Sequence, residues 1–190
     1  PKHSDTWNCM SDLEGDTLMA QVLTNVIIGN TSQGKGDHFW DSGEMNLLKA
    51  LVLYVALDEH RTPDQKNLWE VYQYLITKTE LELALMFGML PFGHPAKAPF
   101  NLFAQASDNV RSNILLGLGT RLQILQSNTV ARLISGNEID LTAPGKRKCA
   151  YYIILSDQET SMAFLSSLFF SFLFIKLTRF ADSCPGGHCP

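Results

Sequence analysis

KCAYYIILSDQETSMAFLSSLFFSFLFIKLTRFAD, residues 148–182, is the stretch that decides the fold class of this chain. A basic triplet, residues 146–148, leads into an unbroken apolar run over residues 150–155. Its aromatic and β-branched side chains are typical of a strand buried on both faces. Polar residues 156–159 supply turn and capping groups, and a helix is predicted from about Ser161. We therefore expect a strand, a short loop and a helix.

The predicted strand has no obvious partner in the sequence. A strand buried on both faces needs neighbours on both edges, and no other segment has a run of the same quality. This imbalance predicts that the stretch belongs to the sheet of a larger protein. Within this chain we expect the strand and the following helix to find some substitute cover.

Residues 162–177 are the candidate for a membrane-spanning helix. The run is short of the roughly 20 residues that a bilayer needs, and it contains three serines before it closes at Lys176. We interpret it as a buried helix packed on a sheet, in a soluble chain.

The charge of the chain is low and unevenly distributed. The 190 residues are 45% hydrophobic, enough for a globular core, and carry a formal charge of −4. This balance argues against a protein that grips a phosphate backbone through clustered lysines and arginines. Residues 1–142 hold ten Lys/Arg against sixteen Asp/Glu, a net −6, whereas residues 143–190 hold five against three, a net +2. The two parts are therefore distinct segments.

The four cysteines, Cys9, Cys149, Cys184 and Cys189, show no framework spacing. We expect free thiols and a reducing, cytosolic setting. The tail CPGGHCP would offer two of these cysteines and His188 to a metal, but no second ligand pair lies nearby, so we interpret it as a flexible end.

Residues 1–142 predict an all-α domain of about six helices. The helix expected from about His38 to Glu59 is almost wholly apolar between Leu47 and Leu57, which indicates enclosure on most sides and makes it the predicted central helix. Helix starts are predicted at Thr62, with Pro63 and Gln65, and at Thr79, with Glu82. The proline-rich residues 91–99 predict a loop.

Two glycines interrupt the helical pattern of residues 107–126. Gly117 and Gly119 each cost a helix about 1 kcal/mol relative to alanine. We therefore expect them to allow close packing or a bend.

Residues 29–36 fit the phosphate-loop pattern G-x-x-x-x-G-K but fail at its last position. That position needs Ser or Thr to coordinate magnesium, and this chain has Gly36. The apolar pattern upstream favours a helix, after which a phosphate loop would be misplaced. We favour a link between helices; the alternative is an autonomous nucleotide hydrolase that uses Lys35.

Arg111, Arg121 and Arg132 lie along the late helices and are candidates for contact with phosphate. Their plainer role, which we favour, is to form salt bridges with the acidic excess. With Lys35 they make up the candidate substrate-binding or DNA-binding residues. The sequence predicts no catalytic residue, cofactor site or metal ligand set.

Three segments carry a resemblance to a known family. GDTLMAQVLTNVIIGNT, DHFWDSGEMNLLKALVLYV and GKRKCAYYIILSDQETSMAFLSSLFFSFLFIKL, in collinear order, closely resemble the TraG/TrwB-like (VirD-type) coupling proteins of type IV secretion and conjugation, in their Gram-positive form. Members are membrane-anchored, hexameric, RecA-like P-loop ATPases that bring a relaxase–DNA substrate to the secretion channel.

The resemblance implies a division of the chain. Residues 1–142 correspond to the all-α domain that interrupts the family's nucleotide-binding domain, and residues 143–190 to the strand and helix where that ATPase fold resumes. The Walker A and Walker B segments, the membrane anchor, ATP and magnesium then belong to the full-length parent. The chain is expected at the cytoplasmic face of the membrane without inserting into it.

The resemblance further implies a substrate-recognition domain with no enzymatic activity of its own. The net −6 of residues 1–142 favours a relaxase or another secreted protein as its partner, with single-stranded DNA bound weakly. Other secretion components are further expected partners. The alternative to recognition, besides the hydrolase, is a purely structural element of hexamer assembly.

Overall fold

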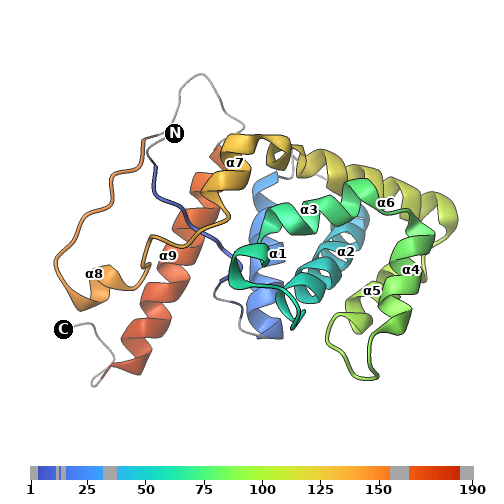
Figure 1. The fold of residues 1–190 in the computed structure, drawn as a ribbon, viewed down its shortest axis with the longest axis horizontal. Helices are drawn as coiled ribbons and strands as arrows, with labels where there is room; N and C mark the ends of the chain where they lie inside the picture. The colour runs from blue at the N-terminus through green and yellow to red at the C-terminus, as the bar shows by residue number, and fades with distance from the viewer. Residues whose placement is uncertain (1–3, 12, 14–15, 32–37, 155–162, 185–190) are drawn as a thin grey trace.

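The computed structural model describes residues 4–11, 13, 16–31, 38–154 and 163–184, and this part of the chain is mainly helical, with no strand. Its elements in order are α1 (Thr17–Thr31), α2 (His38–Ala56), the 3₁₀ turn η1 (Pro63–Gln65), α3 (Leu68–Thr77), α4 (Glu80–Met89), α5 (Lys97–Ala104), α6 (Asp108–Arg121), the 3₁₀ turn η2 (Gln123–Gln126), α7 (Asn128–Leu133), α8 (Ala143–Lys146) and α9 (Ala163–Ser183). The predicted mainly-α fold is confirmed (Figure 1). Short helices such as α7 and α8 raise the number of described helices above the six expected.

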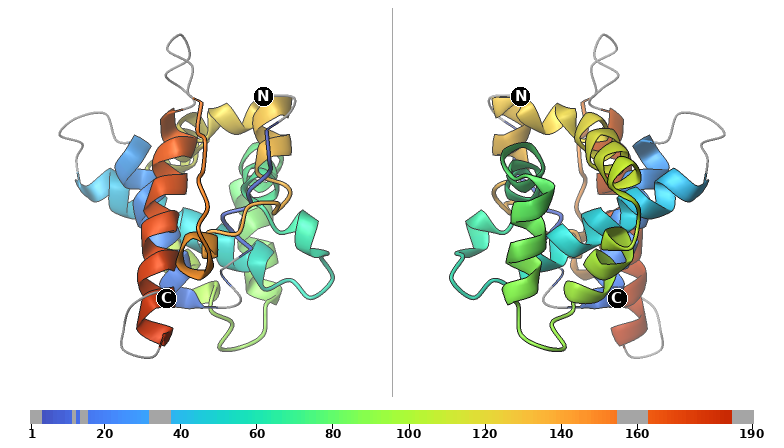
Figure 2. Two further views of the ribbon diagram at one scale, coloured as in Figure 1. Left: turned by 90° about the vertical axis from the view of Figure 1, so that its left-hand side faces the viewer. Right: turned by 90° about the vertical axis from the view of Figure 1, so that its right-hand side faces the viewer.

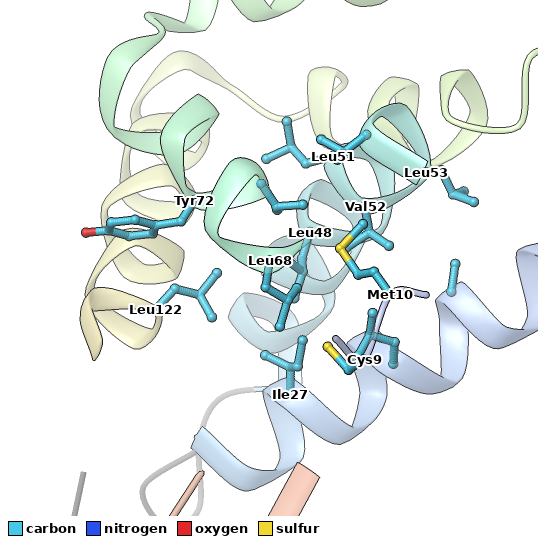
Figure 3. Close-up of a cluster of buried hydrophobic side chains, with 14 of the residues drawn as sticks. Cys9, Met10, Ile27, Leu48, Leu51, Val52, Leu53, Leu68, Tyr72 and Leu122 are labelled. Atoms are coloured by element: carbon cyan, nitrogen blue, oxygen red, sulfur yellow. The ribbon is translucent and has the colours of Figure 1, made fainter. Parts of the chain in front are cut away.

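Helix α2 is the centre of the fold, as predicted. It contacts α1, α3, α5 and α6. Its second half is almost wholly apolar, and most of the side chains from Leu47 to Val55 are buried. Figure 3 shows α2 side chains gathered with others from the N-terminal segment, α1, α3 and the end of α6; the labelled residues are Cys9, Met10, Ile27, Leu48, Leu51, Val52, Leu53, Leu68, Tyr72 and Leu122.

Two predicted helix starts have different outcomes. Thr79 and Glu82 form the expected capping box: the Glu82 N–H donates to Thr79 Oγ1 over 3.3 Å, and the Thr79 N–H donates to Glu82 Oε2 over 2.8 Å. Thr62 precedes only the single turn η1. Helix α3 starts later because Asn67 caps it, its Oδ1 accepting from the Glu70 N–H over 3.0 Å.

The predicted loop over residues 91–99 is shorter than expected, because α5 already begins at Lys97. Pro99 lies in the first turn of α5, where a backbone N–H has no partner within the helix and proline is tolerated. Before it, Gly93 has φ 83°, a left-handed conformation that suits a residue without a side chain.

The N-terminal segment before α1 is irregular, yet it is part of the core. Trp7, Cys9 and Met10 are buried, and the segment runs between α9 and the other helices (Figure 1). The Trp7 ring packs edge-on against Phe169 and Phe172 of α9, with ring centroids 5.4 and 5.7 Å apart. The Trp7 backbone N–H also donates to the carbonyl of Leu133 over 2.7 Å. The segment thus joins α9 to the end of α7.

The predicted buried strand is wrong for residues 150–154. They form no strand, and Tyr152 and Ile154 are 91% and 95% exposed. A strand satisfies its backbone groups by pairing with a neighbouring strand, and the described part of the chain holds none. Leu155, the last residue of the prediction, lies outside the described residues.

Helix α9 finds the substitute cover that the apolar segment before it lacks. It packs on α1 and α8 and on the N-terminal segment, not on a sheet as we interpreted it. Figure 2 shows it along one side of the molecule. The stretch Phe164–Ser183 is long and apolar enough to span a membrane by length and composition. Of an 18-residue apolar segment within it, 22% is buried in the fold.

Helix α9 belongs to the same hydrophobic cluster as the helices before it. The division between residues 1–142 and 143–190 stays a prediction.

We expect Trp7→Ala to destabilise the fold by about 3–5 kcal/mol, because truncating a buried tryptophan leaves a cavity between α9 and the other helices. Urea unfolding followed by circular dichroism measures the change. Trp7→Phe should cost much less. It retains an aromatic ring and removes an indole N–H that has no hydrogen-bond partner among the described residues. Equal losses in the two variants would contradict this account of the core.

Candidate functional site

Arg111 ties the start of α6 to the start of α4. Its guanidinium pairs with the carboxylates of Glu80 and Asp108, the latter at 2.6 Å. It also donates to the carbonyls of Ala104 and Ala106, just before α6. The Arg111 side chain is about one-fifth exposed. Its charge is therefore matched within the chain, as the plainer interpretation predicts.

Arg121 fastens the other end of α6 to α2. It pairs with Asp41 at 2.5 Å and contacts the carboxylate of Glu44. Glu44 is buried in the helix interface, and this burial raises its pKa above the ordinary value although Arg121 acts in the opposite direction. The ion pair thus lies between α2 and the last residue of α6.

Gly117 makes room for the Glu44 carboxylate. A Cβ at this position would lie 2.2 Å from Glu44 Oε1, whereas a Cβ at Gly119 would meet nothing within 4 Å. On the α2 side, a Cβ at Gly43 would lie 2.5 Å from the Ile114 Cδ1 atom. The expectation of close packing is therefore confirmed for Gly117, and Gly119 leaves open space instead.

The remaining two candidates lie elsewhere. Arg132, in α7, is exposed, and its charge helps to lower the pKa of Glu138, which is lowered chiefly by hydrogen bonds from Thr6. Lys35 lies outside the described residues. The first three residues of the phosphate-loop pattern, 29–31, form the last turn of α1, so the helix expected upstream is present and extends into the predicted link. Residues 32–36 lie outside the described residues.

The arginines thus meet different parts of the fold and do not form one patch. Arg111 faces α4, Arg121 faces α2, and Arg132 interacts with the loop after α7. Their role in substrate or DNA binding stays a prediction. The three arginines that the sequence proposed as candidates therefore do not converge on one site.

A groove of about 520 Å³ lies between α3, α6 and η2, beside the turn into α4; we call it the α3–α6 groove. Ile76 and Leu116 stand at it with 51% and 71% of their surface exposed. Gly119, without a side chain, also lines the groove.

Polar groups in fixed positions complete the α3–α6 groove. The Tyr72 hydroxyl accepts from the Gln126 side-chain amide over 2.7 Å, and Figure 3 shows this hydroxyl directed away from the core. Glu80 lines the groove and is held by Arg111. An apolar groove with a few positioned polar groups suits an apolar side chain of a partner whose neighbouring groups can form hydrogen bonds.

A second exposed apolar surface lies on α4. Leu81, Leu85 and Met89 recur every four residues on one face and are 70%, 61% and 86% exposed, and Phe92 in the following loop is fully exposed. We call these four residues the α4 ridge. Sequence reasoning missed it, although the four-residue spacing is visible in the sequence.

The described residues contain no group of three or more His, Cys, Asp or Glu side chains placed to hold a metal ion. Cys9, Cys149 and Cys184 form no disulfide, as predicted. Cys189 and most of the CPGGHCP tail lie outside the described residues.

The family model described as "Type IV secretory system Conjugative DNA transfer" matches residues 1–186. No curated protein and no solved structure matches the chain.

The two glycines of α6 give a matched pair of variants. We expect Gly119→Ala to stabilise the chain by about 0.5–1 kcal/mol, because alanine is the better helix former and has open space there. Gly117→Ala should destabilise it, since the new methyl group displaces the Glu44 carboxylate from Arg121. Thermal unfolding measures both. Stabilisation by Gly117→Ala would show that the contact between α2 and α6 yields easily.

Proposed function

The chain belongs to the family of type IV secretory system conjugative DNA transfer proteins, and we propose that it is the substrate-recognition domain of a coupling protein in that system. Family membership places its role in conjugative DNA transfer through type IV secretion, together with other secretion components, and indicates a membrane-associated location. Recognition of a secreted protein, such as a relaxase, is the proposal.

The α3–α6 groove is the observation that carries the proposal. It combines exposed apolar side chains at its mouth with polar groups that the fold holds in place. Interfaces gain most of their binding free energy where an apolar anchor of one partner enters such a pocket. The groove is open, so a side chain of a partner enters it without any change in the helices.

The electrostatics support a protein partner over bare DNA. Residues 1–142 carry a net −6, and Arg111 and Arg121 are already paired with carboxylates. Binding to a nucleic-acid backbone depends on cations that neutralise phosphates. Paired arginines on an acidic domain supply little of that charge, whereas a basic partner protein is attracted.

The test is a pull-down with the cognate relaxase, using Ile76→Asp and Leu116→Asp. A carboxylate at the mouth of the groove must be desolvated when an apolar anchor enters, so we expect binding to fall at least ~10-fold. Leu18→Asp is the control, because Leu18 is 60% exposed on α1, away from the groove. Unchanged binding in both groove variants, or equal loss in the control, would reject the groove as the recognition site.

Two further arms separate the alternatives. Binding to single-stranded DNA with a steep salt dependence would replace the protein partner by a phosphate backbone. The proposal includes no nucleotide hydrolysis by the chain. We therefore expect no ATP hydrolysis by the chain and no difference between the chain and its Lys35→Ala variant. Hydrolysis abolished by that substitution would favour the autonomous hydrolase.

A further inference from the structure

Gly119 is a helical glycine that contacts within the chain do not explain. It lies inside α6, where glycine makes a helix less stable than alanine does. Its neighbour Gly117 makes room for the Glu44 carboxylate, but a Cβ at Gly119 would meet nothing within 4 Å. In the described part of the chain, nothing occupies the place that a side chain at Gly119 would take.

Gly119 lines the α3–α6 groove, and because it has no side chain, the backbone of α6 forms part of the groove wall there. Leu115 and Leu116, one turn earlier on α6, and Ile76 on α3 supply apolar groups beside it. A second chain in the groove can approach α6 more closely at Gly119 than at any residue with a Cβ atom.

The Tyr72 hydroxyl gives the groove an unused hydrogen-bond donor. Tyr72 is 2% exposed, and Figure 3 shows its hydroxyl directed away from the core. The hydroxyl oxygen accepts from the Gln126 amide. A tyrosine hydroxyl can also donate one hydrogen bond, and no residue in the described part of the chain accepts it. An occupant that excludes water from this hydroxyl must bring an acceptor, because an unpaired buried donor is costly.

Bare helix backbone and an unused donor together fit an extended segment better than a helix. The carbonyls of an extended segment are free to accept, whereas those inside a helix already accept from its own N–H groups. Successive side chains of an extended segment also point to opposite sides. One apolar side chain can therefore enter the groove while the neighbouring main chain lies against α6.

We propose that an extended segment of the secreted protein lies in the α3–α6 groove against Gly119, with one of its carbonyls accepting from the Tyr72 hydroxyl. Its apolar side chain contacts Ile76 and Leu116. This inference rests on the proposed recognition function and adds the conformation and chemistry of the segment that is recognised. Gly119 then lowers the stability of the free chain and raises its affinity for the partner.

Gly119→Ala separates stability from binding, because the same methyl group stabilises the free helix and obstructs the bound segment. We expect its Tm to rise and its affinity for the cognate relaxase to fall about 10-fold, since a methyl group added to a close contact displaces the contacting chain. Thermal unfolding and isothermal titration calorimetry of the 190-residue chain measure the two effects.

Gly88→Ala is the matched control. Gly88 also lies in a helix, α4, with nothing within 4 Å of its Cβ position, and it stands outside the groove. This variant should bind the relaxase as the unaltered chain does. A Gly119→Ala variant that binds as tightly as Gly88→Ala, or that is less stable than the unaltered chain, would overturn the inference.

Tyr72→Phe tests the hydrogen bond to the bound segment. It keeps the buried ring and removes the hydroxyl, so the affinity for the relaxase should fall about 3- to 10-fold. Gln126→Ala removes the amide that donates to this hydroxyl but leaves the hydroxyl itself, and should bind nearly as the unaltered chain does. Unchanged binding by Tyr72→Phe, or an equal loss in Gln126→Ala, would exclude the assigned hydrogen bond.

The proposed function and this inference fail in different ways. Loss of binding in Ile76→Asp and Leu116→Asp, with none in Gly119→Ala and Tyr72→Phe, would keep the groove as the recognition site and reject the extended segment against α6. No binding of the relaxase by the unaltered chain would overturn both.

Discussion

The packing of Trp7, in the N-terminal segment, against α9 is the contact on which the arrangement of the chain depends. Helix α9 lies along one side of the molecule (Figure 2), and Phe169 and Phe172 meet the Trp7 ring there. The same N-terminal segment hydrogen-bonds to Leu133 at the end of α7. A segment without regular structure thus connects the two ends of the sequence. It can do so because its polar backbone groups find partners in the core while its side chains fill the space between helices.

The α2–α6 interface shows why the arginines are better explained by structure than by phosphate binding. Gly117 brings the helices close enough for Arg121 to meet the buried Glu44, and Arg111 repeats the pattern at the other end of α6 with Glu80. At Glu44 a carboxylate removed from water requires a cation nearby, whereas Glu80 remains about 30% exposed beside Arg111. An arginine committed in this way would have to give up that carboxylate before it could bind a phosphate. The acidic side chains of residues 1–142 therefore neutralise these two arginines within the chain, and a net charge of −6 remains.

The sequence predicted those features of the fold that depend on neighbouring residues. Residues close in sequence form the Thr79–Glu82 capping box, and the apolar composition of α2 alone indicates its central place. The strand over residues 150–154 was wrong because a strand needs a partner from elsewhere in the chain. The site was harder for the same reason. Arg111 and Glu80 are 31 residues apart, Arg121 and Asp41 are 80 apart, and the groove exists only once three elements have packed.

The two apolar surfaces at opposite ends of the molecule differ in what they require (Figure 1). The α4 ridge stands on a capped helix whose backbone groups are bonded within the element, so only apolar side-chain area is left to cover. Residues 150–154 expose Tyr152 and Ile154 from an extended backbone outside any described sheet. Such a segment needs hydrogen-bond partners as well as apolar cover. A helix packed against the ridge can therefore cover its side chains, whereas a strand paired with residues 150–154 would supply both backbone hydrogen bonds and apolar cover.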